Sequence, residues 1–144
     1  MGKTGTGKST LCNALLYGPD FDDKKKFDMS PSINSCTHKT TFSTDNIWTY
    51  TQEKFTIVDT PGLSDNPKDD AKFIKEMIEC IRNEVCDVSL FLFVVNGNDI
   101  RWDSNTTNLV KIFEDNFGTG FWKHFTIVFT MWSYDDKQVK KRER

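Results

Sequence analysis

The sequence predicts an α/β fold with a mostly parallel sheet and helices on both faces. Three observations predict it. Short apolar segments that suit buried strands alternate along the chain with segments whose apolar residues follow helical spacing. A glycine-rich motif stands before the first helical segment, and an Asp-Thr-Pro-Gly motif follows a strand. The 144 residues are enough for a sizeable core, so we expect residues 1–144 to form a single domain.

The elements follow from apolar periodicity and from the residues that break it. Helical spacing predicts helices over 8–16 and 69–85. A third predicted helix begins at a cap formed by Ser104 or Asn105 and ends at about residue 117. Apolar or alternating runs predict an edge strand from about 40 to 50 and buried strands over 55–58, 88–95 and 125–129. Residues 20–34 are polar and form a loop, and the charged tail after 136 suits a helix. The helical stripe expected in the core consists of Ile74, Met77, Ile78, Ile81 and Val85.

Residues 2–9, GKTGTGKS, match the phosphate-binding pattern G-x-x-x-x-G-K-[S/T]. Its glycines allow successive N–H groups to turn toward a phosphate chain, and the helix that follows favours the same anion. We expect Lys8 to reach the β- and γ-phosphates and Ser9 to bind Mg²⁺. The other residues predicted to contact the nucleotide are Lys3, Thr4, Gly5, Thr6, Gly7 and Thr10. The alternative is a flexible Gly- and Thr-rich terminus.

A phosphate-binding loop normally joins a buried strand to a helix, and that strand sits centrally in its sheet. Only Met1 stands before Gly2. We therefore expect the chain to lack the first strand and the C-terminal part of its fold, and to be a fragment of a longer domain.

The second motif, DTPG at 59–62, follows the predicted strand 55–58. Asp59 would stand at the carboxyl end of that strand, where it can hold Mg²⁺ directly or through a water. Gly62 has no Cβ, so its amide can approach a γ-phosphate. The alternative is a plain Pro-Gly turn.

Composition excludes several classes of function. The net charge of −2 gives no electrostatic case for nucleic-acid binding, and the short basic runs at 24–26 and 140–144 suit a solvated surface. No run of about 18 apolar residues is present, so no segment should span a membrane. Four scattered cysteines without a C-x-x-C pair indicate reduced thiols and a cytoplasmic protein. Any membrane association would come from segments outside this chain.

The motifs in this order resemble the G domain of the immunity-associated nucleotide-binding GTPases, which include the avirulence-induced type and are related to septins and chloroplast-import GTPases. The resemblance is carried by residues 2–9, 35–37, 58–63, 101–103 and 127–130. It implies a three-layer P-loop NTPase G domain that binds GTP or GDP with Mg²⁺ and cycles between bound states.

The resemblance also implies roles for two loop residues. Thr37 would be the switch threonine that closes on Mg²⁺ and the γ-phosphate, with Thr40 as second choice. Arg101 would act as an arginine finger in a nucleotide-dependent homodimer, because it stands in the loop where the family carries one. The alternative for Arg101 is a surface side chain paired with Asp99 or Asp103.

Two departures from common GTPases affect hydrolysis and base recognition. Leu63 replaces a water-orienting Gln, so hydrolysis should be slow. Thr130 matches the start of the guanine motif, but Met131 and Trp132 replace its basic residue. The candidate acceptors for guanine are Asp135, the first choice, and Asp136, which both stand later in the chain than the Asp of the common motif. Trp132 either stacks on the base or packs beneath the loop. The chain is thus predicted to be a GTP-binding switch with weak GTPase activity. A P-loop ATPase, a non-hydrolysing nucleotide-bound scaffold and a degraded product without its own fold are the alternatives.

Overall fold

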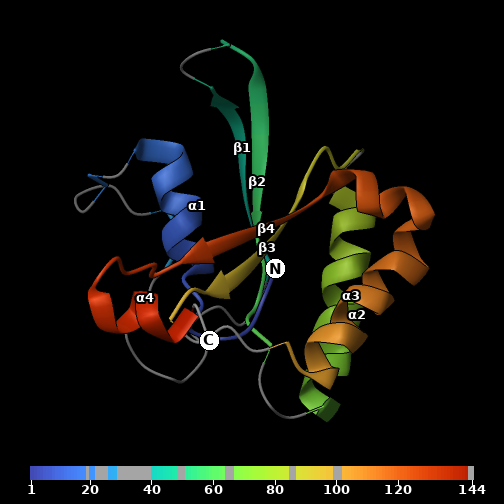
Figure 1. The fold of residues 1–144 in the computed structure, drawn as a ribbon. Coiled ribbons are helices and arrows are strands. Elements are labelled where there is room, and N and C mark those ends of the chain that lie inside the picture. The colour runs from blue at the N-terminus through green and yellow to red at the C-terminus, as the bar shows by residue number, and fades with distance from the viewer. Residues whose placement is uncertain are drawn as a thin grey trace.

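A computed structural model describes residues 1–18, 20–21, 26–28, 40–48, 51–63, 67–84, 87–98 and 102–142. Figure 1 shows the order of elements along the chain. They are α1 (Lys8–Tyr17), β1 (Thr41–Ile47), β2 (Lys54–Asp59), α2 (Pro67–Glu84), β3 (Phe91–Asn96), α3 (Ser104–Phe117), the 3₁₀ helix η1 (Thr119–His124), β4 (Phe125–Thr130) and α4 (Asp136–Arg142).

The sequence predicted these helices and strands to within a few residues, with three differences. The N-cap of α3 is Asp103, not Ser104 or Asn105, because the Asp103 side chain accepts from the Thr106 backbone N–H. The strand β3 begins at Phe91 rather than at 88, and Leu90 before it is exposed. The helix η1 was not expected. It follows Gly118, whose φ of 78° ends α3.

The described strands form two pairs, and the first residues of the chain lie between them. β1 pairs with β2 antiparallel, while β3 pairs with β4 in parallel. The Met1 amino group donates to Leu92 O (2.9 Å), and Met1 O accepts from the Val94 N–H (2.8 Å). Lys3 forms a parallel bridge with Leu63, directly beyond β2. The segment 1–3 therefore links β3 to the end of β2, which places the phosphate-binding loop between the two strand pairs.

Helices flank the strands on both sides. Figure 1 shows α1 on one side and α2 with α3 on the other. The core lies on the α2 and α3 side, and four of the five residues of the predicted α2 stripe are buried there, while Val85 lies outside the described residues. The ring of Phe91 from β3 contacts the rings of three other phenylalanines from α3 and η1, namely Phe113, Phe117 and Phe121. This aromatic packing fixes α3 against the strands.

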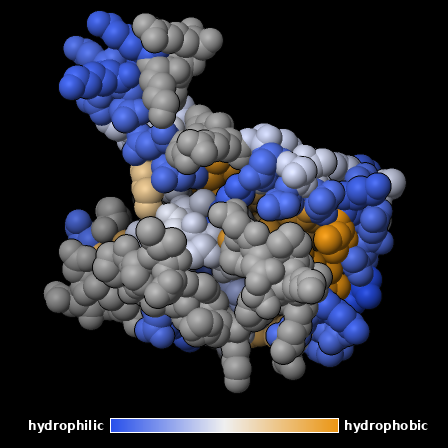
Figure 2. Space-filling model, turned by 90° about the horizontal axis from the view of Figure 1, so that it is seen from below, coloured by the Kyte–Doolittle hydropathy of each residue, from blue (hydrophilic) through white to orange (hydrophobic). Residues whose placement is uncertain are grey.

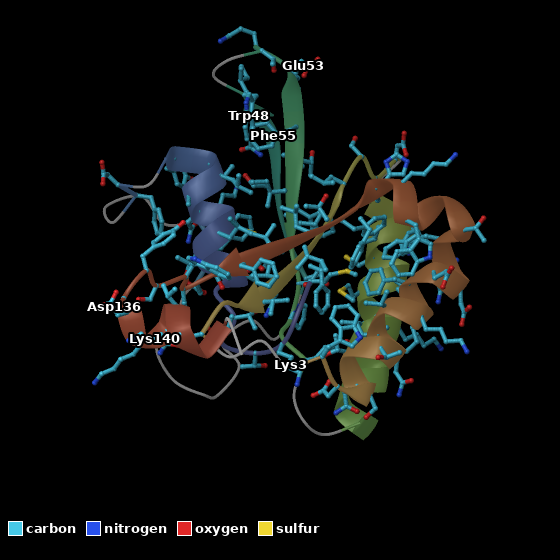
Figure 3. All side chains as sticks on the ribbon, in the orientation of Figure 1. Lys3, Trp48, Glu53, Phe55, Asp136 and Lys140 are labelled. Carbon is cyan, nitrogen blue, oxygen red and sulfur yellow. The ribbon has the colours of Figure 1, made fainter. Side chains whose placement is uncertain are left out.

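The antiparallel ribbon of β1 and β2 extends away from the rest of the molecule (Figure 1). Near its tip the rings of Trp48 and Phe55 lie 5.3 Å apart in an edge-to-face arrangement (Figure 3). A bulge in β1 is filled by Asn46, whose Nδ2 donates to Ser43 O (2.7 Å) and lies 3.2 Å from Phe55 O. These contacts join β1 to β2 in the outer part of the ribbon, and the strand β2 runs back into the molecule and ends at Asp59.

Several large hydrophobic side chains of the described residues are exposed, among them Ile47, Phe129 and Met131. On the face drawn in Figure 2, most of the coloured residues are hydrophilic, and hydrophobic residues show in places between them. Within the described part of the chain, none of the helices has the length and apolar character needed to cross a bilayer. Among the described residues, neither Cys12 nor Cys80 is in a disulfide, and Cys36 and Cys86 lie outside the described residues.

Candidate functional site

The phosphate-binding loop turns from residue 2 into α1 through two glycines with left-handed backbone angles. Gly5 has a φ of 76°, and Gly7, the N-cap of α1, has a φ of 82°. Residues with a Cβ rarely adopt these angles, which explains why glycine stands at both positions. The helix α1 begins at Lys8, as predicted, so its unpaired N–H groups and its positive dipole end face the loop. Thr10, in the first turn of α1, is exposed.

The side chain of Lys8 folds back into the loop. Its Nζ donates to Lys3 O (2.8 Å), and the same carbonyl accepts from Thr6 Oγ1 (2.9 Å). Only 7% of Lys8 is exposed, and burial lowers the pKa of its ammonium to about 8, although nearby Asp59 acts in the opposite direction. The buried Lys8 ammonium is therefore placed to leave the Lys3 carbonyl and donate to a phosphate oxygen instead.

Ser9 and Asp59 meet beside Lys8, as the motifs predicted. Ser9 Oγ donates to Asp59 Oδ2 (2.7 Å). Asp59 is 2% exposed, and its Oδ1 is buried without a hydrogen-bond partner among the described residues. Burial raises the pKa of this carboxyl, while the Ser9 hydrogen bond and Lys8 lower it. A hydroxyl and a carboxylate with one unused oxygen are the hard oxygen ligands that Mg²⁺ prefers, so these residues fit a magnesium ion. Thr37, the third predicted ligand, lies outside the described residues.

The two sequence motifs form one hydrogen-bonded unit. Leu63 O accepts from the Thr4 N–H (2.9 Å), and the Leu63 N–H donates to Gly2 O (3.2 Å). A Cβ built on Gly62 would lie 2.6 Å from Thr4 Cα and 2.9 Å from Lys8 Nζ. Position 62 therefore tolerates no side chain, which a plain Pro-Gly turn would not require. The close approach of Gly62 to Lys8 brings its backbone beside the predicted phosphate position.

Thr130 joins the loop to the end of β4. Its Oγ1 donates to Thr6 O (2.5 Å) and lies 3.2 Å from Val95 O, while Thr130 O accepts from the Gly97 N–H (2.7 Å). The sequence identified Thr130 only as the start of the base motif and not as a site residue. Its position at a strand end that faces the ligand edge was the signal for this contact.

The segment after β4 has its own local structure. Asp135 Oδ1 accepts from the backbone N–H groups of Lys137 (3.1 Å) and Gln138 (3.0 Å), and Oδ2 accepts from Ser133 Oγ. Asp135 thus caps α4, and its role in guanine binding stays a prediction. The Trp132 ring lies 5.6 Å from that of Phe129 and against Gly97, where a Cβ would be 2.8 Å from Trp132 Cε3. Trp132 thus packs against this segment, and its stacking on a base stays a prediction.

The side chain of Lys3 does not point into the loop. Its Nζ pairs with Asp103, and this hydrogen bond, followed by the one from the Thr106 N–H, holds the pKa of that carboxyl well below its usual range. Lys3 contributes its carbonyl, not its charge, to the site. Asp103 was one of two partners considered for Arg101, but Arg101 and Asp99 lie outside the described residues.

A glycine-rich turn into a helix, a buried lysine, and a Ser–Asp pair at the carboxyl end of a strand define a P-loop nucleotide-binding domain of the α/β class. The model of the AIG1 family matches residues 1–140, and the chain belongs to this family. The resemblance seen in the sequence is thereby confirmed.

Two kinds of relatives support the assignment. Immune-associated nucleotide-binding protein 7 of Arabidopsis thaliana is 26% identical over 130 residues, which are 90% of this chain and 39% of the relative. Toc33 from Arabidopsis thaliana in complex with GDP and Mg²⁺ matches with a TM-score of 0.67 at 22% identity. A dimerization-deficient arginine-to-alanine mutant of Toc33 matches with a TM-score of 0.69 at 19% sequence identity. Both matches cover 99% of this chain and 56% of the Toc33 chain, and they show that the fold is that of a P-loop GTPase G domain.

Proposed function

We propose that this chain binds GTP and GDP with Mg²⁺ and acts as a switch that hydrolyses GTP slowly. The observation that carries the proposal is the Ser9–Asp59 pair, in which one buried carboxylate oxygen has no partner among the described residues. An unsatisfied buried carboxylate is costly for folding, and such a group indicates a bound cation. Toc33, which has the same fold, was solved with GDP and Mg²⁺.

Each residue of the loop has a defined part in this proposal. Backbone N–H groups at Gly5 and Gly7 would surround the phosphates, and Lys8 would leave the Lys3 carbonyl for a phosphate oxygen. Ser9, Asp59 and Thr37 would hold Mg²⁺. When bound, the ion neutralises charge that develops on the β- and γ-phosphate oxygens.

The proposal of slow hydrolysis rests on Leu63. Its backbone is hydrogen-bonded to Gly2 and Thr4, and its side chain packs against the core cluster. An aliphatic side chain in this position cannot orient an attacking water. The same observation favours a second candidate, a nucleotide-bound interaction module that does not turn over GTP.

Arg101 is proposed to supply the missing catalytic group in a nucleotide-dependent homodimer. An arginine finger can raise turnover by ~10³–10⁵. The support is the family to which the chain belongs, together with the Toc33 structure described as a dimerization-deficient arginine-to-alanine mutant.

The test is a titration with fluorescent GTP and ATP analogues in the presence of Mg²⁺, followed by a turnover assay over a range of protein concentrations. We expect GTP to bind more tightly than ATP, Lys8→Ala to abolish binding, and turnover per molecule to rise with concentration. A preference for ATP would select the ATPase alternative. Tight GTP binding with no turnover at high concentration would select the non-hydrolysing module.

A further inference from the structure

A side-chain contact ties the phosphate-binding loop to α3. Lys3 Nζ pairs with the Asp103 carboxylate across 100 positions of sequence. Asp103 uses its two oxygens separately. Oδ2 accepts from Lys3, and Oδ1 accepts from the N–H (2.9 Å) and the Oγ1 (2.8 Å) of Thr106. The carboxylate is therefore oriented by its own helix and, in turn, orients Lys3.

The helix that carries Asp103 is a rigid base for this contact. Its inward face is almost fully buried against α2 and the strands, with exposed fractions between 1% and 4% at Leu109, Val110 and Phe113. The ring of Trp102, next to Asp103, lies 5.6 Å from that of Phe93 on β3. In Figure 3, Lys3 lies on the side of the strands toward α3. Movement of Lys3 is thus limited by an element that belongs to the core.

The backbone of Lys3 is at the same time the resting partner of the phosphate-binding lysine. Lys3 O accepts from Lys8 Nζ (2.8 Å) and from Thr6 Oγ1 (2.9 Å). We propose that Asp103 is a positioning residue of the nucleotide site, because its ion pair with Lys3 fixes the loop carbonyl from which Lys8 moves to the phosphates. This inference rests on the proposed nucleotide binding and adds a residue outside the loop motif to it.

The proposal predicts a coupled effect on affinity. Without the charge of Asp103, Lys3 would lose its anchor and the loop would have to be ordered by the nucleotide itself, which weakens binding. The two side chains are 33% and 40% exposed, so the ion pair is screened and its effect is modest. We expect a loss of roughly two- to five-fold in affinity at low salt. The loss should shrink at high salt.

The experiment is a double-mutant cycle with Asp103→Asn, Lys3→Met and the double variant, measured as the affinity for a fluorescent GTP analogue with Mg²⁺. Asparagine caps a helix about as well as aspartate, so Asp103→Asn removes the ion pair and leaves the cap. If Asp103 acts through Lys3, the double variant binds no more weakly than the weaker single variant. Losses that multiply in the double variant, or a loss that does not respond to salt, would show that Asp103 only stabilises α3 and would overturn the proposal.

Asp115→Asn is the matched control, because it removes the same charge from the exposed face of the same helix. It should leave the affinity unchanged, and a loss equal to that of Asp103→Asn would overturn the proposal. Failure of the unchanged protein to bind the GTP analogue would instead overturn the proposed function. The two failures are therefore distinguishable.

Discussion

Replacing Asp59 by Asn should stabilise the nucleotide-free protein and weaken its binding of nucleotide with Mg²⁺. Asp59 is 2% exposed, and burial is the main cause of the raised pKa of its carboxyl. Oδ1 has no hydrogen-bond partner among the described residues, whereas Oδ2 accepts from Ser9. An Asn oxygen can keep the Ser9 hydrogen bond while the buried charge is removed.

The magnitude follows from the cost of an unsatisfied buried group, which is about 1–3 kcal/mol and larger when the group is charged. The side-chain amide nitrogen that Asp59→Asn introduces would also lack a partner, so only the part due to charge is recovered. We expect the free energy of unfolding to rise by about 1 kcal/mol and the Tm by about 3 °C. Affinity for GTP in the presence of Mg²⁺ should fall by at least about ten-fold, because a metal ligand is weakened.

The pH dependence supplies an independent check. The pKa of Asp59 is higher in the folded protein than its ordinary value of 3.8, so its ionised form destabilises the fold at neutral pH. This destabilisation disappears as the pH falls through the folded-state pKa toward 3.8. The stability gain of Asp59→Asn should therefore be largest at neutral pH and shrink in acid. Chemical denaturation at several pH values measures it. A variant that is less stable at pH 7, or that keeps its Mg²⁺-dependent affinity, would refute the reasoning.

Three further predictions concern the loop and the dimer. Gly62→Ala should cost about 1–3 kcal/mol of unfolding free energy in chemical denaturation, because its Cβ would lie 2.6 Å from Thr4 Cα; an unchanged stability would contradict that packing. The pKa of Lys8 is about 8 in the folded protein and 10.5 ordinarily, so the unfolded state binds more protons between these values. Lys8 should therefore make the stability of the nucleotide-free protein rise with pH above about 8, until the Cys12 thiol, whose pKa burial raises from 9.0 to about 12, offsets the rise above pH 9. A Lys8→Met variant with an unchanged pH profile would exclude Lys8 as the source of the rise. Arg101→Ala should abolish the rise of GTP turnover with protein concentration, and turnover that still rises would exclude the finger.

Much of the fold could be predicted because its elements have strong local patterns. The apolar spacing of α2 and the apolar run of β3 locate them to within a few residues. The start of α3 was harder to locate, because Asp103, Ser104 and Asn105 are all good caps, and only the contact with Thr106 selects Asp103.

The site was predictable where its residues belong to one motif and not where they meet across the chain. Lys8, Ser9 and Asp59 stand in motifs whose chemistry is local, and the structure brings them together. The contacts of Lys3 with Asp103 and of Thr130 with Thr6 join residues 100 and 124 positions apart. No local pattern signals the pairing of Lys3 with Asp103, and the place of Thr130 at a strand end indicates the ligand edge but not its partner Thr6, because both contacts depend on the order of the strands.

The measurement that tests the central claim most directly is the affinity of the unchanged protein for a fluorescent GTP analogue, with Mg²⁺ and with Mg²⁺ removed by a chelator. The account predicts tight binding that weakens by at least about ten-fold without the ion, because Ser9 and Asp59 then have no cation to hold between protein and phosphate. An affinity that is independent of Mg²⁺, or no binding of the analogue, would contradict the assignment of this site.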